Sequence, residues 1–237
     1  MKQILGLLLL FVGCEVVFAQ SEFSRPDVPG NLMVDIGFNY LNEEPTTIDQ
    51  SGFRSKSVGI YYAKRKAISN KFSCYFGLGL GLEKLSLGDT TTLQSGVVLS
   101  GSGSTDSLAS VYIADIPAGL SYDKNRLAIT YLEIPLDIRF HPKGTQDGEG
   151  LFIGVGGILG LRLNSHTKFK YEEGDETVIE KIQGDYNLSA FRYGIQVRFG
   201  FKGVHLFYKQ YFSDVFQDPL GGANPRMTTI GINFTGF

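Results

Sequence analysis

Apolar residues alternate with polar residues or glycine in about eight separate stretches of this chain. In the first stretch, from Leu32 to Tyr40, every even-numbered position is apolar, whereas the odd-numbered positions include Asp35, Gly37 and Asn39. A period of two is that of a β-strand whose two faces meet different surroundings. The chain is therefore expected to be built almost entirely of strands.

The connections between the expected strands alternate in length. We expect strands at 31–41, 54–65, 71–87, 127–141, 150–164, 187–201, 203–212 and 226–235. The segments 66–70, 141–150 and 201–203 are then short, whereas 42–53, 88–126, 165–186 and 213–225 are longer. Membrane β-barrels have short periplasmic turns and longer external loops. The pattern predicts an all-β fold, an eight-stranded antiparallel transmembrane β-barrel with up-and-down meander topology, over residues 31–237.

The two faces of the strands differ in polarity. In the expected strand 71–87, the even positions from Phe72 to Leu82 are apolar, and the odd positions from Ser73 to Glu83 carry small, polar or charged residues and one tyrosine. A membrane barrel turns its apolar face to lipid and its polar face to the lumen. By this parity, the charged residues expected in the lumen are Asp35, Glu83, Glu133, Asp137, Arg139, Arg162, Arg192, Arg198 and Lys209.

These charges are expected to form ion pairs, because an isolated charge inside a narrow barrel is costly. An eight-stranded barrel has an interior that side chains fill. We therefore expect a structural charge network that plugs the lumen.

The N-terminus has the features of a secretion signal. Lys2 precedes an apolar run from Ile4 to Val12, and Val17-Phe18-Ala19 offers a cleavage site. The expected division is a signal peptide at 1–19, a periplasmic segment at 20–30 and the barrel domain at 31–237. Alternatively, Phe11-Val12-Gly13-Cys14 could be a lipoprotein box, with Cys14 as the lipidated residue.

Composition agrees with an exported barrel. The 237 residues include 30 Gly, 12 Tyr and 18 Phe but no Trp, so an aromatic girdle at the membrane surfaces must use Tyr and Phe. The net charge of −2 gives no basic stripe, so no nucleic-acid partner is expected. No phosphate loop or paired-cysteine metal site is present, so no cofactor is expected.

Three segments leave alternatives open. In 88–126, Val97 to Leu99 and Val111 to Ile113 could form a hairpin outside the barrel or, as a rival, two further strands of a ten-stranded barrel. Pro135 lies within an expected strand, where either a bulge would accommodate it or Glu133 and Pro135 would open a contact site. The loop 165–186 is acidic at its tip, which is either a solvated turn or a divalent-cation site formed by Glu172, Glu173, Asp175 and Glu176.

Catalytic chemistry is sparse. Ser165-His166 invites comparison with barrel enzymes that modify lipids through a lipid-facing serine and histidine. By strand parity, however, Leu161, Leu163 and Ser165 face lipid, which turns His166 inward. No acid shares its face to complete a catalytic set. We therefore expect no enzymatic activity.

Several motifs resemble the PorT-like outer-membrane β-barrel family of Gram-negative bacteria. They are Gly77-Leu-Gly-Leu-Gly-Leu-Glu83, Tyr131-Leu-Glu-Ile-Pro-Leu136, Gly150-Leu-Phe-Ile-Gly154 and Ile230-Gly-Ile-Asn-Phe234. The resemblance implies an eight-stranded outer-membrane barrel, and some members of that family are linked to protein secretion and gliding. The chain departs from the usual pattern at Phe237, which is terminal but out of phase with the apolar positions of the last expected strand.

Together these features predict a small outer-membrane barrel that acts as a structural or accessory protein. Its expected partners are outer-membrane lipid and, through loops or turns, proteins of a secretion or envelope complex. A small pore or solute-binding barrel is the alternative, and a lipid-modifying enzyme is a minor one.

Overall fold

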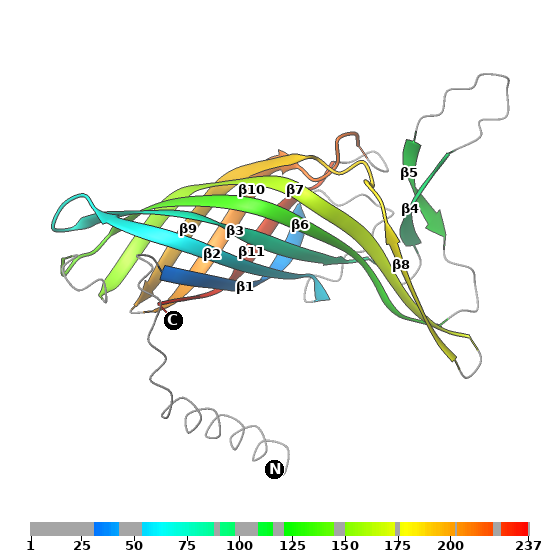
Figure 1. Cartoon of the computed structure of the whole chain (residues 1–237), viewed down its shortest axis with the longest axis horizontal. Coiled ribbons are helices and arrows are strands. Elements are labelled where there is room, and N and C mark those ends of the chain that lie inside the picture. Colours follow the sequence, from blue (N-terminus) through cyan, green and yellow to red (C-terminus); the bar gives the residue numbers. More distant parts are fainter. Residues whose placement is uncertain are drawn as a thin grey trace, which may run out of the picture.

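Eight strands form a closed antiparallel barrel in the computed structural model (Figure 1). The structure describes residues 31–42, 54–87, 91–97, 109–115, 121–144, 150–173, 176–201, 203–219 and 224–236, so the expectations for residues 1–30 and for Phe237 lie outside it. The barrel strands are β1 (Asn31–Asn42), β2 (Lys56–Ala67), β3 (Phe72–Ser86), β6 (Ser121–Phe140), β7 (Leu151–Glu173), β9 (Phe191–Phe201), β10 (Val204–Asp214) and β11 (Arg226–Thr235).

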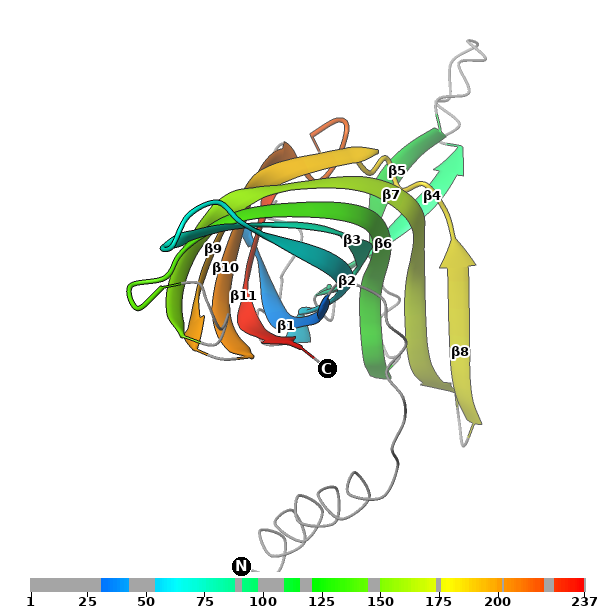
Figure 2. The same cartoon turned by 60° about the vertical axis from the view of Figure 1, so that its left-hand side comes forward.

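The ring closes between strands that are distant in sequence. Its order is β6-β3-β2-β1-β11-β10-β9-β7, and pairing of β6 with β7 joins the two ends. β6 and β7 are consecutive strands, whereas β1 and β11 are the first and last strands of the chain, and they pair from Met33–Thr235 to Asn42–Arg226. Figure 2 shows the strands curving around this ring. The eight-stranded antiparallel barrel expected from the sequence is therefore confirmed.

The segment 88–126 does not add strands to the barrel. Among the described strands, β4 (Thr91–Val97) and β5 (Ala109–Asp115) pair only with each other, in a separate two-stranded sheet. Meanwhile β3 pairs directly with β6, up to Ser86 opposite Arg126. The hairpin is therefore present, and the ten-stranded rival is wrong.

The outer end of the barrel continues into a three-stranded sheet. β6 and β7 are 20 and 23 residues long, and β8 (Glu176–Gln183) pairs with the far part of β7. We call this sheet, formed by 121–129, 164–173 and 176–183, the outer extension; it reaches away from the ring beside β8 in Figure 1. The expectation of a plain loop at 165–186 is wrong, because most of that segment forms a β-hairpin.

The irregularity in β7 lies at Leu163 and not at Pro135 on the neighbouring strand. Thr130 pairs with Asn164 and Tyr131 with Arg162, so Leu163 is an extra residue on β7. Pro135 sits in an unshifted register, with Phe76 opposite Leu136 and Gly79 opposite Glu133. Its ring lies against Gly77, where a Cβ would be only 3.0 Å from Pro135 Cγ. The expected bulge at Pro135 is therefore wrong, and glycine on the neighbouring strand makes room instead.

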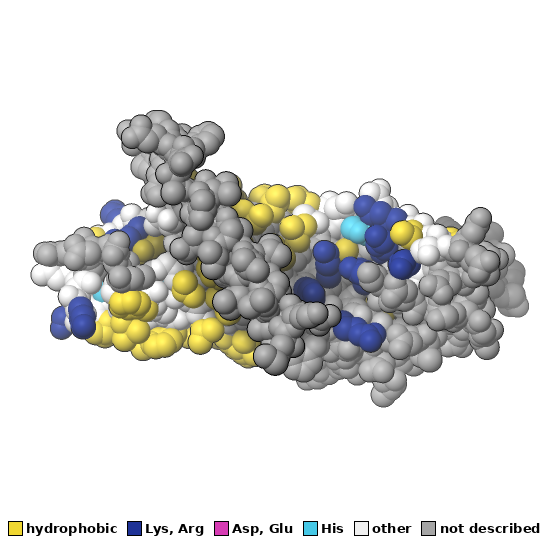
Figure 3. Space-filling model, turned by 90° about the horizontal axis from the view of Figure 1, so that it is seen from below, with side chains coloured by type: hydrophobic (Ala, Val, Ile, Leu, Met, Phe, Trp, Pro, Cys, Tyr) yellow, Lys and Arg dark blue, Asp and Glu magenta, His cyan; other side chains and the backbone are white. Residues whose placement is uncertain are grey.

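Apolar side chains from all eight strands form a belt on the outer surface of the barrel, and Figure 3 shows part of it in yellow on one face. Its members are outward-facing and exposed by 37% to 70%, and they include Ile36, Ile60, Phe76, Leu80, Ile134, Leu136, Val155, Leu159, Ile195, Leu206 and Ile232. Phenylalanine and tyrosine occur at both ends of the belt: Phe38, Phe191, Tyr193 and Phe212 near the long connections, and Phe72, Phe140, Phe199 and Phe201 near the short turns. Such aromatic girdles are characteristic of barrels that span membranes.

No helix among the described residues is long and apolar enough to cross a membrane.

The interior has two zones. Its middle is polar and charged, whereas its outer end holds an apolar cluster. The cluster consists of Leu41, Leu85, Leu87, Leu93, Leu127, Ile129, Tyr131, Ile158, Tyr186, Leu188, Tyr211, Val215, Phe216 and Met227. Leu93 belongs to β4, so the β4–β5 hairpin contributes a side chain to this cluster at the outer mouth.

Candidate functional site: the charged lumen

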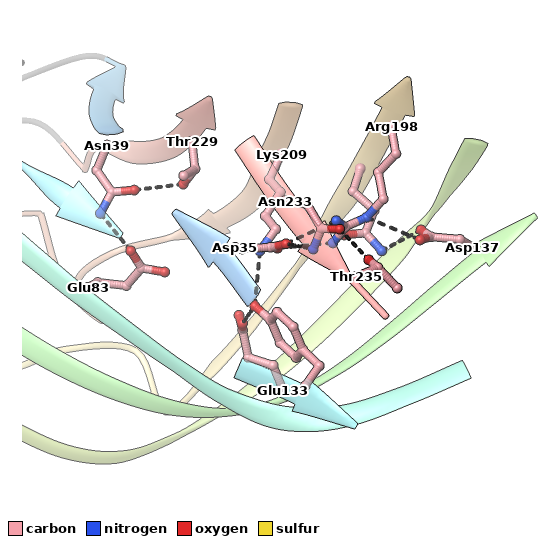
Figure 4. Close-up of polar contacts among 12 residues, drawn as sticks. Asp35, Asn39, Glu83, Glu133, Asp137, Arg198, Lys209, Thr229, Asn233 and Thr235 are labelled. Atoms are coloured by element: carbon pink, nitrogen blue, oxygen red, sulfur yellow. Dashed lines mark hydrogen bonds and ion pairs between the residues drawn. The ribbon is translucent and has the colours of Figure 1, made fainter. Parts of the chain in front are cut away.

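Strand parity brings eight of the nine predicted lumen charges into the barrel interior. Each of the eight side chains is at most 4% exposed: Asp35, Glu83, Glu133, Asp137, Arg139, Arg192, Arg198 and Lys209. They comprise four carboxylates and four cations, so their formal charges cancel. Figure 4 shows most of them converging from different strands.

Asp35 is the centre of the group nearer the short turns. The Arg198 guanidinium donates two hydrogen bonds of 3.0 Å, one to each Asp35 carboxylate oxygen. Lys209 Nζ lies 2.8 Å from Asp35 Oδ2, and Asn233 Nδ2 donates to Oδ1 at 2.5 Å. A bidentate arginine with two further donors satisfies most of what a buried carboxylate can accept.

Asp137 completes this group from β6. Arg198 Nε lies 3.1 Å from Asp137 Oδ2, and Gln196 donates to the other oxygen at 2.5 Å. Arg139 Nη2 lies 3.4 Å from Asp137 Oδ2. The Arg139 guanidinium is also 3.7 Å from the centroid of the Tyr75 ring, a cation–π contact. Arg198 therefore bridges carboxylates on β1 and β6, across the barrel from its own strand, β9.

Glu133 is the centre of the group nearer the outer end. Arg192 Nε donates to Glu133 Oε1 at 2.9 Å, and Arg192 Nη2 donates both to Glu133 and, at 2.8 Å, to Glu83. The hydroxyls of Tyr61 and Tyr211 donate to Glu133 at 2.6 and 3.1 Å. Arg192 thus holds two carboxylates together, where alone they would repel each other.

Lys209 connects the two groups. Its Nζ, already paired with Asp35, donates to the Tyr61 hydroxyl at 3.0 Å, and that hydroxyl in turn donates to Glu133. The charged interior is therefore one continuous network. It ties the first strands of the chain to β6, β9 and β10.

Glycine provides the room for the arginine side chains. A Cβ at Gly160 would lie 2.8 Å from Arg192 Cγ, and one at Gly81 would lie 2.5 Å from Glu133 Oε2. Both glycines face inward beside the network. Glycine is therefore required at these two inward positions because a larger side chain would collide with Glu133 or Arg192.

Arg162 does not join the network. It lies at the outer end, where it pairs with Asp185 and donates to Ser165 Oγ at 3.2 Å. Asp185 follows β8, in the segment 165–186 that the sequence predicts to be a loop. The partner of Arg162 could therefore not be predicted from strand parity.

Several network residues were not among the predicted site residues, because they are neutral. They are Tyr61, Tyr211, Asn39, Gln196, Asn233 and Thr229. Asn39 illustrates their role: it donates to Glu83 at 2.6 Å and accepts from Thr229 at 2.7 Å. The signal that could have identified them is parity, because Asn39 and Gln196 share the inward face with Asp35 and Arg198.

The side chains of Ser165 and His166 face the opposite sides of the strand from those predicted. The extra residue at Leu163 inverts the parity of β7, so Ser165 is 3% exposed and donates to the Gly184 carbonyl at 2.6 Å. His166 is directly opposite Ala128 on the outward side. The prediction that Ser165 faces lipid and His166 faces inward is therefore wrong.

A different serine and histidine do meet, at the end of the barrel with the short turns. Ser73 Oγ lies 2.8 Å from His141 Nε2, and both residues are at most 1% exposed. The His141 ring lies 5.7 Å from that of Phe152, and Phe152 contacts His205 edge-on. The pair is enclosed by these rings, and no acid contacts His141 Nδ1 among the described residues. It closes the inner end of the lumen.

No group of three or more potential metal ligands occurs in the described part of the chain. The side chains of Glu172, Glu173, Asp175 and Glu176, predicted as a candidate cation site, lie outside the described residues.

An apolar outer belt, a charged interior and eight antiparallel strands together define a small membrane β-barrel of the outer-membrane type. Residues 18–215 match the family described as "Outer membrane protein beta-barrel domain". The chain belongs to this family. Membership of the narrower PorT-like group, suggested by the sequence motifs, is not shown by this match.

The solved structures that match this chain have low sequence identity to it. Ail, the attachment invasion locus protein of Yersinia pestis, is 11% identical over 88% of this chain and 99% of its own, with a TM-score of 0.35. A triple mutant of the Rhodopseudomonas blastica porin is 11% identical over 87% of this chain and 99% of its own, with a TM-score of 0.19. No curated protein matches the chain.

Proposed function

We propose that this protein is a non-conducting, non-enzymatic accessory barrel of the outer membrane that binds a protein partner through its outer extension. Export through cleavage of the 1–19 signal peptide is part of this proposal. The partner we propose is a component of a secretion or envelope complex.

The observation that carries the non-conducting role is the ion-pair network. Arg198 and Lys209 span the lumen to Asp35, and Arg192 spans it to Glu83 and Glu133, with all six side chains almost completely buried. The apolar cluster lies above the network at the outer mouth. Moving these side chains aside would leave paired charges unpaired, at a cost of several kcal/mol each. A steady pore is therefore disfavoured.

The outer extension supports the binding role. Among the described strands, β8 is the last of its sheet, and its edge away from β7 pairs with no described strand. Its sequence also places apolar side chains outside the belt, including Ile182, which is 47% exposed. A sheet edge of this kind can accept a strand from another protein.

Planar-bilayer recording tests the non-conducting role. The purified full chain should give no steady current, whereas a porin reconstituted in the same way serves as the positive control. A stable, large conductance of the unmodified barrel would reject the plugged lumen. The solute-binding or pore alternative would then take its place.

Site-specific cross-linking in native membranes tests the binding role. A photo-reactive residue at Ile182 should form an adduct with an envelope protein, whereas one at Lys143, in an inner turn, should not. Adducts at Lys143 alone would reject the outer extension as the contact surface. Absence of adducts at both positions would reject the accessory role.

A further inference from the structure

Basic side chains gather on the outward face of the outer extension, directly beyond the apolar belt. Arg126 on β6, Lys168 on β7 and Lys181 on β8 occupy one cross-strand row, each directly opposite the next. In the adjacent row, Lys84 and His166 lie on either side of Ala128. We call Lys84, Arg126, His166, Lys168 and Lys181 the basic patch.

Figure 3 shows Lys and Arg side chains grouped around a histidine, beside the yellow belt.

The arrangement is unfavourable without a ligand. Like charges directly opposite each other on neighbouring strands destabilise the pairing. Within the described residues, Lys84, Arg126, Lys168 and Lys181 form no ion pair. Burial, followed by the positive charges of Lys181, Lys168 and Lys84, lowers the pKa of the His166 imidazole. An anion bound across these strands would relieve the repulsion between the cations.

The bulge at Leu163 creates this patch. Before the bulge, odd-numbered residues of β7, such as Leu161, face outward. Without the extra residue this alternation would continue, and the even-numbered Lys168 would face the inner side of the extension. With it, Lys168 faces the same side as Lys181 and Arg126. The bulge therefore brings cations from three strands onto one surface.

The position of the patch indicates which anion it receives. On β3, Leu80 and Leu82 belong to the apolar belt, and Lys84 follows on the same face, about 7 Å further along the strand. The connections at this end are the long ones, which places it at the external membrane surface. A lipid whose acyl chains lie along Leu80 and Leu82 would have its headgroup at Lys84.

We propose that the basic patch binds the phosphate-bearing headgroup of an outer-leaflet lipid. From β3 to β8 the patch covers about 15 Å, three strand spacings, which is wide enough for more than one phosphate. Lysine and arginine at the anionic surface of a membrane attract such headgroups without needing a deep pocket. The proposal is independent of the protein partner proposed above.

Native mass spectrometry of the full chain in detergent tests this with diphosphoryl lipid A as the probe. The variant Lys84→Gln/Lys168→Gln/Lys181→Gln should bind the probe on the order of 100-fold more weakly, since each basic residue near an anionic lipid surface contributes about 1 kcal/mol. The matched control is Lys64→Gln/Lys66→Gln/Lys71→Gln, which removes the same charge from exposed lysines at the other end of the barrel. The control should bind almost normally.

Equal losses in both triple variants, or no loss in either, would overturn the proposal. Displacement of the lipid by micromolar inorganic pyrophosphate would also overturn it, because the patch would then be a site for soluble anions. If the first triple variant fails to fold, Lys181→Gln alone replaces it, because β8 lies outside the closed ring. That single variant should weaken binding about fivefold, and unchanged binding would reject the patch.

Discussion

At the scale of single residues, each lumen charge is buried away from water and is stabilised by the other side chains of the network. Glu133 accepts hydrogen bonds from Arg192, Tyr61 and Tyr211, and none of these donors can reach water readily. Removing one member of a buried ion pair typically costs more than the pair itself contributes, because the remaining charge stays buried. The network should therefore tolerate paired changes better than single ones.

Glu133→Gln should lower the free energy of unfolding by about 3–5 kcal/mol. Arg192→Gln should be similarly costly, because it leaves Glu83 and Glu133 side by side without a cation. The double variant should lose less than the sum of the two, with a coupling of about 0.5–3 kcal/mol. Urea unfolding in lipid vesicles measures all three. Asp218→Asn, at an exposed position, is the control; strictly additive losses would mean that the pair does not interact.

Neighbouring residues on β6 face opposite environments. Leu136 is 45% exposed in the apolar belt, whereas Asp137 is 2% exposed in the lumen. Arginine on the lipid face near the membrane midplane costs about 2–4 kcal/mol. Leu136→Arg should destabilise the barrel by that amount in vesicle folding titrations, whereas Leu136→Phe should be mild. A harmless arginine at this position would show that the belt does not contact lipid.

Parity also explains how much of the site was predictable at this scale. Asp35, Glu133 and Arg198 were assigned to the lumen because one residue in two faces inward along a regular strand. Their specific partners were not predictable, since Arg198 reaches Asp35 through the closure of the ring rather than through a neighbouring strand. The tyrosines were missed because a hydroxyl carries no charge to count.

At the scale of elements, the long connection between β3 and β6 is an addition to the barrel rather than part of its wall. In the part of the chain that the structure describes, the β4–β5 hairpin pairs with no barrel strand, and surface insertions of this kind cost little stability. Its one described buried side chain, Leu93, covers the apolar cluster at the outer mouth. The hairpin is thus a separate two-stranded sheet that places one side chain, Leu93, over the cluster.

Deleting residues 91–115 should leave a folded barrel. The protein should still migrate faster on gels without heating than after heating, as intact barrels do in mild detergent. A modest loss in stability is expected, because Leu93 no longer covers the cluster. The variant Leu93→Ala in the full chain should reproduce that loss. Failure of the deletion variant to assemble in the membrane would mean that the hairpin supports the wall.

The outer ends of β6 and β7 show where sequence reasoning failed for elements. The polar, charged composition of 165–186 suggested a loop, yet backbone pairing to β8 extends the sheet beyond the membrane. One extra residue at Leu163 then reversed every later inward or outward assignment on β7. A bulge leaves no mark in an alternating pattern, because Leu161 and Leu163 both remain outward.

At the scale of the whole molecule, the barrel is determined by two independent regularities that agree. The alternation of connection lengths gave the strand count and the end at which the termini lie. The alternation of side chains gave the inside and the outside. Neither depends on partners or on contacts distant in sequence, so both were available from the chain alone. The outer extension was not available in this way, because its shape depends on the bulge at Leu163 and on the pairing of β8 with β7.

The lumen charges divide unequally along the chain. β1, β2 and β3 contribute Asp35 and Glu83 but no cation of the network, whereas the strands from β6 onward contribute two more cations than carboxylates. The two segments are therefore an acidic half and a basic half, each incomplete alone. A chain cut between β3 and β6 should reassemble from its fragments when they are refolded together. An N-terminal fragment carrying Asp35→Asn and Glu83→Gln should fail to do so, which gel mobility would reveal. This result would show that attraction between opposite charges directs the pairing of two segments of one polypeptide.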